Sequence, residues 1–66
     1  MELTPDRLLR DAEVRRITAL PTTTRDRLEA EEKFPKRVKI GPRAVAWAES
    51  EIQAWIRDRL AERHAA

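Results

Sequence analysis

The stretch KFPKRVKIGPRAVAW, residues 33–47, decides the fold. Val38-Lys39-Ile40 alternates apolar, basic and apolar side chains, as a half-buried strand does. Gly41-Pro42 is a turn signal, and residues 44–47 then form a second short apolar strand. Residues 33–43 carry five cations and no acid, although the whole chain has a net charge of only +2. The stretch therefore predicts a β-hairpin whose outer face and tip are basic.

Ahead of the hairpin, residues 11–20 predict a short helix. Asp11 can serve as its N-cap by accepting backbone N–H bonds of the first turn. Val14 and Ile17 are spaced i, i+3, and Leu20 continues the phase. This spacing gives the helix one apolar stripe over about two turns.

A second helix is predicted from Thr22 to Glu32. Pro21 disfavours helix at the residue before it and suits the first turn of a new helix. The inward stripe of this helix is thin, with Thr24 and Leu28, and Phe34-Pro35 ends it. Two short helices joined by a tight turn form a helix-turn-helix.

The ends of the chain complete the predicted domain. Leu8-Leu9 is expected to be extended, while residues 1–7 and 64–66 are expected to form a frayed arm and tail. A final helix is predicted over residues 49–63, with Ser50 as an alternative N-cap. Its apolar stripe is Ile52, Trp55, Ile56 and Leu60.

The composition excludes several classes of protein. A chain of 66 residues is one small domain, predicted here to be mainly α with a small β-hairpin. It has no cysteine and one histidine, His64, so no catalytic group, metal site or cofactor is expected. No apolar run approaches the ~20 residues of a membrane span, and the acidic N-terminus has no apolar stretch of a signal peptide. We therefore expect a cytoplasmic protein that does not contact the membrane.

A helix-turn-helix followed by a basic hairpin is the winged arrangement that binds double-stranded DNA. The second helix would present polar side chains to base edges in the major groove, and the hairpin, or wing, would neutralise phosphates. The predicted recognition-helix contacts are Thr22, Thr23, Arg25 and Arg27, and the predicted wing contacts are Lys36, Arg37, Lys39 and Arg43. Asp26 and the acidic end of the helix count against deep insertion, so only the N-terminal half of the helix is expected to approach DNA closely. Thr22 and Thr23 are equally well explained as caps of the helix.

Arg25 and Arg27 have an alternative explanation, because they could be solvated or paired with Glu29 and Glu31. The same question arises for the two tryptophans. A base-stacking surface is conceivable, but Trp47, Trp55 and Phe34 are the only large rings of a very small domain. Core packing is the favoured interpretation for them.

The chain resembles the AlpA-type regulators and the related small phage excisionases. The matching residues run in order and without gaps from Leu8 to Ile56. The specific part is Phe34-Pro35, Val38-Lys39-Ile40-Gly41, Trp47, Glu51-Ile52 and Trp55-Ile56. The resemblance implies a MerR-like winged helix-turn-helix fold and DNA binding. It places Thr22, Thr23, Asp26 and Arg27 on the exposed positions of the recognition helix and Lys36, Lys39 and Arg43 on the wing. It also implies a core that consists of Val14, Ile17, Leu20, Leu28, Val38, Ile40, Trp47, Ile52, Trp55 and Ile56.

Four positions depart from the family pattern. Ala19 stands where a turn glycine is common, so a different type of turn is expected there. Arg25 replaces an apolar residue, and its stem could cover the core while its head reaches water. Asp26 stands where an aromatic residue is common, and Glu32 replaces a frequent glycine.

The leading hypothesis is an excisionase that bends attachment-site DNA beside a tyrosine integrase, which is its candidate partner. An AlpA-type transcriptional regulator is the alternative, and a protein-binding adaptor that uses the C-terminal helix is a remote one. Self-association on DNA is predicted to be head-to-tail. In it, the acidic helix end (Glu29, Glu31, Glu32) of one molecule would meet the basic wing (Lys36, Arg37) of the next.

Overall fold

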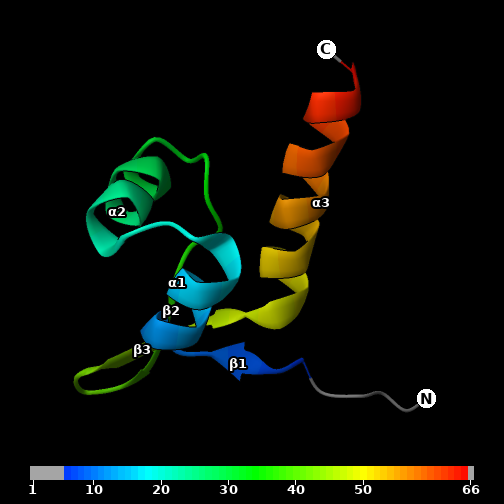
Figure 1. Ribbon diagram of the computed structural model, residues 1–66. Helices are drawn as coiled ribbons and strands as arrows, with labels where there is room; N and C mark the ends of the chain where they lie inside the picture. Colours follow the sequence, from blue (N-terminus) through cyan, green and yellow to red (C-terminus); the bar gives the residue numbers. More distant parts are fainter. Residues whose placement is uncertain (1–5, 66) are drawn as a thin grey trace.

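The computed structural model describes residues 6–65 and has three helices and three short strands (Figure 1). In chain order they are β1 Leu8–Leu9, α1 Asp11–Thr18, α2 Thr22–Ala30, β2 Val38–Gly41, β3 Ala44–Ala48 and α3 Glu49–Ala65. The predicted class, mainly α with a small β-hairpin, is confirmed, and the arrangement is that of a winged helix-turn-helix. No helix within the described part of the chain is both long and apolar enough to cross a membrane.

The sheet has the order β1-β3-β2 and is antiparallel throughout. Leu8 and Leu9 pair with Ala48 and Trp47, which confirms the extended conformation predicted for them. In the hairpin, Val38 pairs with Ala46, Lys39 with Val45 and Gly41 with Ala44, so the register shifts at Ile40. The central strand β3 thus connects the N-terminal arm to the wing.

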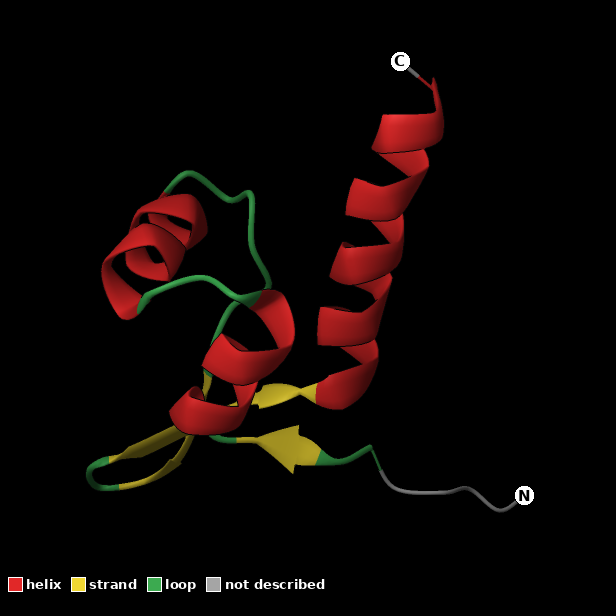
Figure 2. Cartoon of the chain, viewed as in Figure 1, coloured by secondary structure: helices red, strands yellow, loops and turns green. Residues whose placement is uncertain are grey.

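The core lies between α1, α3 and β3. Its buried apolar residues are Leu9, Val14, Phe34, Ala46, Trp47 and Ile52, and Leu20, Leu28, Val45, Trp55 and Ile56 pack partly buried against it. The core prediction was wrong for Ile17, Val38 and Ile40, which are 36%, 43% and 43% exposed. Figure 2 shows the hairpin extending away from the helices, which agrees with the partial exposure of the two strand residues.

The first helix starts and ends differently from the prediction. Arg10 is the N-cap, without a side-chain cap bond, so Asp11 is the first helical residue and not the cap. The helix ends at Thr18 because Ala19 adopts a left-handed conformation, with φ 63°. The Ala19 N–H bonds the carbonyl of Arg15 over 2.8 Å, as in a glycine-type helix end. The expectation of a different turn was therefore wrong: alanine adopts the glycine conformation.

The second helix ends at Ala30, two residues before the predicted end. Glu32 is left-handed, with φ 61°. Its N–H bonds the carbonyl of Glu29, and the next N–H, from Lys33, bonds the carbonyl of Leu28 over 2.7 Å. This pair of bonds is a Schellman motif, which normally has glycine at the left-handed position. The helix therefore stops at its own end motif and not at Phe34-Pro35.

The N-terminal arm is attached to the start of α3. The carboxylate of Asp6 accepts bonds from the Ser50 N–H, over 3.1 Å, and from the Ser50 hydroxyl, over 2.6 Å. The carbonyl of Arg7 accepts the N–H of Glu49 over 2.8 Å. Asp6 and Arg7 are thus not frayed. Ser50 is a residue within α3, and the side chain that caps the start of this helix is that of Asp6. The rest of the predicted arm, residues 1–5, lies outside the described residues.

The predicted C-terminal tail was partly wrong. The helix α3 continues to Ala65, two residues beyond the predicted end at Arg63. Residue 66 lies outside the described residues. Figure 1 shows the C-terminal part of α3 rising beyond the helix-turn-helix, with Leu60 on it 47% exposed. The apolar stripe of α3 therefore enters the core only through its first turns.

Candidate nucleic-acid interface

The two helices of the helix-turn-helix place a polar surface outward on α2. Thr22, Thr23, Asp26 and Arg27 are all exposed, as predicted for recognition positions. The N-cap of α2 is Pro21, and no side chain caps this helix end. Capping, the alternative explanation for the two threonines, was therefore wrong. Thr22 and Thr23 are the first two helical residues of α2, and both are exposed.

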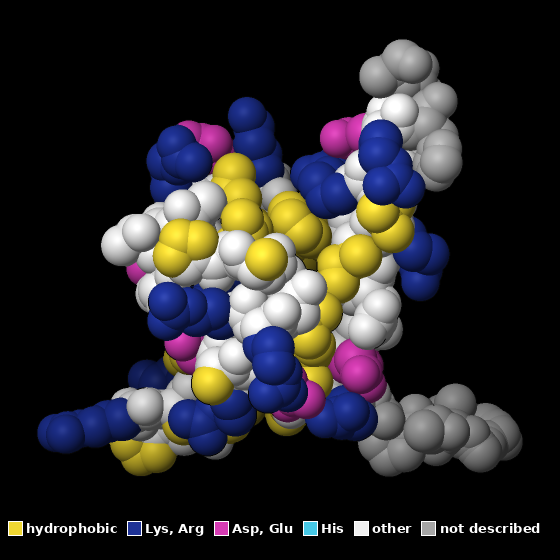
Figure 3. Space-filling view, viewed as in Figure 1, with side chains coloured by type: hydrophobic (Ala, Val, Ile, Leu, Met, Phe, Trp, Pro, Cys, Tyr) yellow, Lys and Arg dark blue, Asp and Glu magenta, His cyan; other side chains and the backbone are white. Residues whose placement is uncertain are grey.

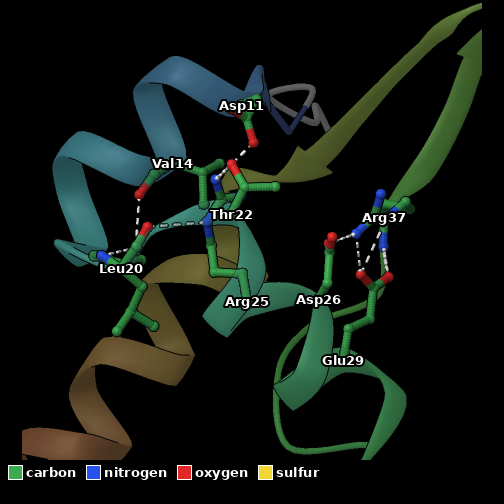
Figure 4. Close-up of polar contacts among 9 residues, drawn as sticks. Asp11, Val14, Leu20, Thr22, Arg25, Asp26, Glu29 and Arg37 are labelled. Carbon is green, nitrogen blue, oxygen red and sulfur yellow. Dashed lines mark hydrogen bonds and ion pairs between the residues drawn. The ribbon is translucent and has the colours of Figure 1, made fainter.

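Arg25 is buried under α2, with 1% of its side chain exposed (Figure 4). Its Nη2 donates to Asp11 Oδ1 over 2.6 Å and to Thr22 Oγ1 over 3.2 Å. Its Nε donates to the carbonyl of Leu20 over 3.2 Å. A guanidinium enclosed in this way cannot reach DNA, so its predicted place on the exposed recognition surface was wrong. The alternative predictions for Arg25, an ion pair with Glu29 or Glu31 or a guanidinium in solvent, were wrong for the same reason.

Arg37 joins the base of the wing to α2 (Figure 4). The backbone N–H of Arg37 donates to Glu29 Oε2 over 2.7 Å. The side-chain Nη2 of Arg37 donates to Glu29 Oε1 over 2.7 Å and to Asp26 Oδ1. Burial acts to raise the pKa of Glu29, but the hydrogen bonds and charge of Arg37 outweigh it and lower that pKa. The same hydrogen bonds raise the pKa of Arg37. Arg37, Asp26 and Glu29 thus form an ion-pair cluster between the wing and α2, in which Arg37 and Asp26 stay 39% and 52% exposed.

Both arginines meet the ring of Trp47. The guanidinium carbons of Arg25 and Arg37 each lie 5.4 Å from the ring centroid, within cation–π range. Trp47 itself is 2% exposed, and its indole N–H has no hydrogen-bond partner among the described residues. The prediction that Trp47 belongs to the core is confirmed. Its face additionally supports the two cations that hold α2.

Three predicted wing cations remain free. Lys36, Lys39 and Arg43 are exposed, and their side chains make no hydrogen bond or ion pair within the part of the chain that the structure describes. Figure 3 shows Lys and Arg side chains over the projecting hairpin at the lower left. Exposed apolar side chains, Val38 and Ile40, lie on either side of Lys39 along β2. The wing therefore combines free cations with an uncovered apolar surface.

Two further cations were missed from the sequence. Arg10 and Arg15, at the start and in the middle of α1, are exposed and unpaired among residues 6–65. The charge count gives no indication of them, because the basic and acidic residues of 1–20 are equal in number. In the structure, Arg25 pairs with Asp11, and Arg7 pairs with Glu13 over 3.1 Å, so the local acids are occupied elsewhere. Arg10 and Arg15 could be identified as unpaired cations only if these distant ion pairs were known.

A groove separates the loop after α2 from α3. Phe34, Pro35 and Val38 line one side, and Ala54, Trp55 and the polar side chains of α3 line the other. Trp55 also contacts the loop, because its ring meets Phe34 edge-on at 5.0 Å and its N–H donates to the carbonyl of Lys33 over 2.9 Å. Trp55 packs against the core as predicted, although it is only partly buried.

Sequence comparisons agree with this architecture. The family described as Prophage CP4-57 regulatory protein (AlpA) matches residues 7–60. The chain is also 37% identical over 62 residues to an uncharacterised protein, ORF88, of Enterobacteria phage P4, an alignment that covers 94% of this chain and 70% of the relative. The family match spans both helices of the helix-turn-helix, the wing and most of α3. The chain therefore belongs to the AlpA family of small, phage-associated, DNA-binding regulators.

Proposed function

We propose that the protein is a sequence-specific binder of double-stranded DNA, and that it acts as a phage excisionase in the bacterial cytoplasm. In this proposal α2 enters the major groove with Thr22, Thr23 and Arg27, and the wing contacts flanking phosphates through Lys36, Lys39 and Arg43. The observation that carries the proposal is the placement of an exposed polar helix face beside a wing of free cations. Arg10 and Arg15 would add phosphate contacts from α1, the helix that crosses the backbone in such folds.

DNA bending is the part of the proposal that the wing supports. Val38 and Ile40 are each 43% exposed on one edge strand. Apolar side chains that enter the minor groove loosen base stacking and kink the duplex. We expect Ile40→Ser to lower the bend angle while affinity changes little, which a gel assay with permuted site positions measures. An unchanged bend angle would exclude the wing as the source of the bend.

Head-to-tail self-association on tandem sites is also part of this proposal, but fewer of the predicted charged residues are available for the contact between molecules. Glu29 and Arg37 bond each other within one chain, so neither is free to meet a neighbour. Glu31 lies 3.8 Å from Lys33, which leaves Glu32 and Lys36 as the charges for a contact between molecules. DNA with one, two or three sites is titrated with protein. Equal affinity per site on all three would contradict cooperative assembly.

The deciding experiment for the function has two steps. DNA flanking the gene is first footprinted, because a tandem array favours an architectural role and a single site favours a repressor. Purified tyrosine integrase is then supplied with attachment-site DNA, with and without the protein. Excision that depends on the protein supports an excisionase. Site-specific binding without any effect on excision supports the alternative, an AlpA-type transcriptional regulator.

A protein-binding adaptor that uses α3 remains the remote alternative. The feature that favours it is the groove beside Trp55, together with the exposed Leu60 on the projecting part of α3. It requires that affinity for DNA be negligible at moderate salt. A titration with a labelled duplex at physiological ionic strength therefore separates it from both DNA-binding functions.

A further inference from the structure

The most buried side chain that attaches the recognition helix to the domain is a charged one. Of the nine residues of α2, Arg25 is the only buried one, and Thr24, Leu28 and Glu29 are partly buried. An apolar side chain in the most buried position would hold the helix by contacts that have no direction. A guanidinium instead has donors at fixed angles, so it specifies where its partners must lie.

Arg25 uses those donors to join four parts of the domain. One nitrogen bonds Asp11 at the start of α1 and Thr22 at the start of α2, and another bonds the carbonyl of Leu20 in the turn. Its guanidinium carbon lies 5.4 Å from the ring centroid of Trp47 in β3. These contacts restrict both the crossing of α2 over α1 and the rotation of α2 about its own axis.

We infer that Arg25 is a positioning residue that sets the DNA-sequence selectivity of the protein without touching DNA. The inference rests on the proposed function, because it requires that α2 read base edges. Thr22, Thr23 and Arg27 all lie on the same short helix, so one rotation displaces all three together. A base contact depends on hydrogen-bond geometry, whereas phosphate contacts tolerate small displacements. Selectivity should therefore depend on Arg25, and general affinity should not.

Stability and selectivity can be separated at this position. Asp11 is 51% exposed, so removal of its partner leaves no buried unpaired charge. Loss of one partner of an ion pair is strongly destabilising where the remaining charge is buried, and the remaining Asp11 carboxylate is half in water. Arg25→Leu should therefore fold. Arg25→Lys retains the charge but loses the planar fork, and Asp11→Asn retains an acceptor but loses the charge.

The first measurement uses DNA that the parent protein selects from a randomised duplex library, and a random duplex of equal length as the reference probe. For Arg25→Leu, we expect the ratio of the two affinities to fall about tenfold, the discrimination attributed to a single base contact. Affinity for the random duplex and its salt dependence should stay unchanged. Arg57→Leu on α3, a matched exchange of an exposed arginine, should preserve the ratio.

The second measurement needs no DNA. Residual dipolar couplings of the backbone report the orientation of α2 relative to α1 and α3 in the free protein. We expect the α2 couplings alone to change in Arg25→Leu and, to a smaller extent, in Arg25→Lys and Asp11→Asn. If Arg25→Leu does not fold, the two conservative variants provide both measurements.

Two results would overturn the inference. Unchanged couplings together with an unchanged affinity ratio would mean that Arg25 only fills space. A loss of about one unit of salt slope in Arg25→Leu would mean that Arg25 contacts a phosphate itself. If the parent protein selects no sequence at all, the proposed function fails, and the couplings still decide whether Arg25 orients α2.

Discussion

Two residues adopt a backbone conformation that their side chains disfavour. Ala19 and Glu32 end α1 and α2 with φ values of 63° and 61°. A left-handed residue other than glycine costs about 1–2 kcal/mol, of which part is offset because glycine loses more chain entropy on folding. Both helix ends therefore have the left-handed backbone that favours glycine, but a residue other than glycine occupies it. The domain is less stable than it would be with glycine at these two positions.

We predict that Ala19→Gly and Glu32→Gly each raise the free energy of unfolding by about 0.5–1 kcal/mol. Urea denaturation, followed by circular dichroism, measures the change. The matched control is Ala61→Gly, at an exposed position inside α3, where the same exchange should destabilise by about 0.5–1 kcal/mol. A loss of stability in all three variants would show that the two turns are not strained.

Arg43 at the tip of the wing provides a second test at the level of a single residue. It is exposed and unpaired within residues 6–65, so its charge is available to a phosphate. We predict that Arg43→Ala lowers the slope of log affinity against log salt by about one unit for selected and random DNA alike. Arg57→Ala on α3 should leave the slope unchanged. A changed base preference with an unchanged slope would contradict a phosphate contact.

At the level of elements, the features that could be predicted from the sequence are those set by residues close together in the chain. The hairpin was correct because its alternation and its turn signal lie within ten residues. The predicted C-terminal ends of α1 and α2 were wrong, because Ala19 and Glu32 adopt the left-handed conformation without being glycine. The cap of α3 was missed because Asp6 reaches Ser50 from 44 residues away. Arg25 was assigned to the surface because periodicity treats arginine as polar, and its partner Asp11 is 14 residues distant. Long-range pairs of charges are invisible to a local pattern.

The cap of α3 makes a prediction about pH. Hydrogen bonds from the hydroxyl and N–H of Ser50 lower the pKa of Asp6 in the folded state. A carboxyl whose folded pKa is depressed adds stability above its unfolded pKa and loses it as pH falls through the folded value. The parent should therefore exceed Asp6→Asn in stability at pH 7, and the difference should shrink in acid, below about pH 4.

Urea denaturation of both proteins at a series of pH values checks this prediction. Asp58→Asn on α3 is the control, since Asp58 makes no hydrogen bond or ion pair among the described residues. It should follow the parent at every pH. A difference between parent and Asp6→Asn that is constant with pH would contradict the linkage.

At the scale of the whole molecule, a small core has little stability to lose. Trp55 joins α3 to the loop after α2 through Phe34 and the carbonyl of Lys33. Truncation of a buried aromatic side chain costs about 3–5 kcal/mol. Trp55 is partly buried, but a domain of 66 residues has only a few kcal/mol in total. We predict that Trp55→Ala lacks a cooperative thermal transition at 25 °C or above.

Leu60→Ala on the same helix is the control for that prediction. Leu60 is 47% exposed, and exposed substitutions usually change stability by about 0.5 kcal/mol or less. Its melting temperature should stay close to that of the parent. A Trp55→Ala protein that melts cooperatively near the parent temperature would show that α3 is held in place by other contacts.

The attachment of the N-terminal arm also has a consequence for synthesis on the ribosome. Leu8 and Leu9 are made first, yet their partners Ala48 and Trp47 are made about forty residues later. Contacts between residues far apart in the chain form late, because a long loop must be closed before they contribute. The residues of α1 and α2 have therefore been synthesised before the sheet can close. Completion of the sheet and of the Asp6 cap has to wait until Ser50 has emerged.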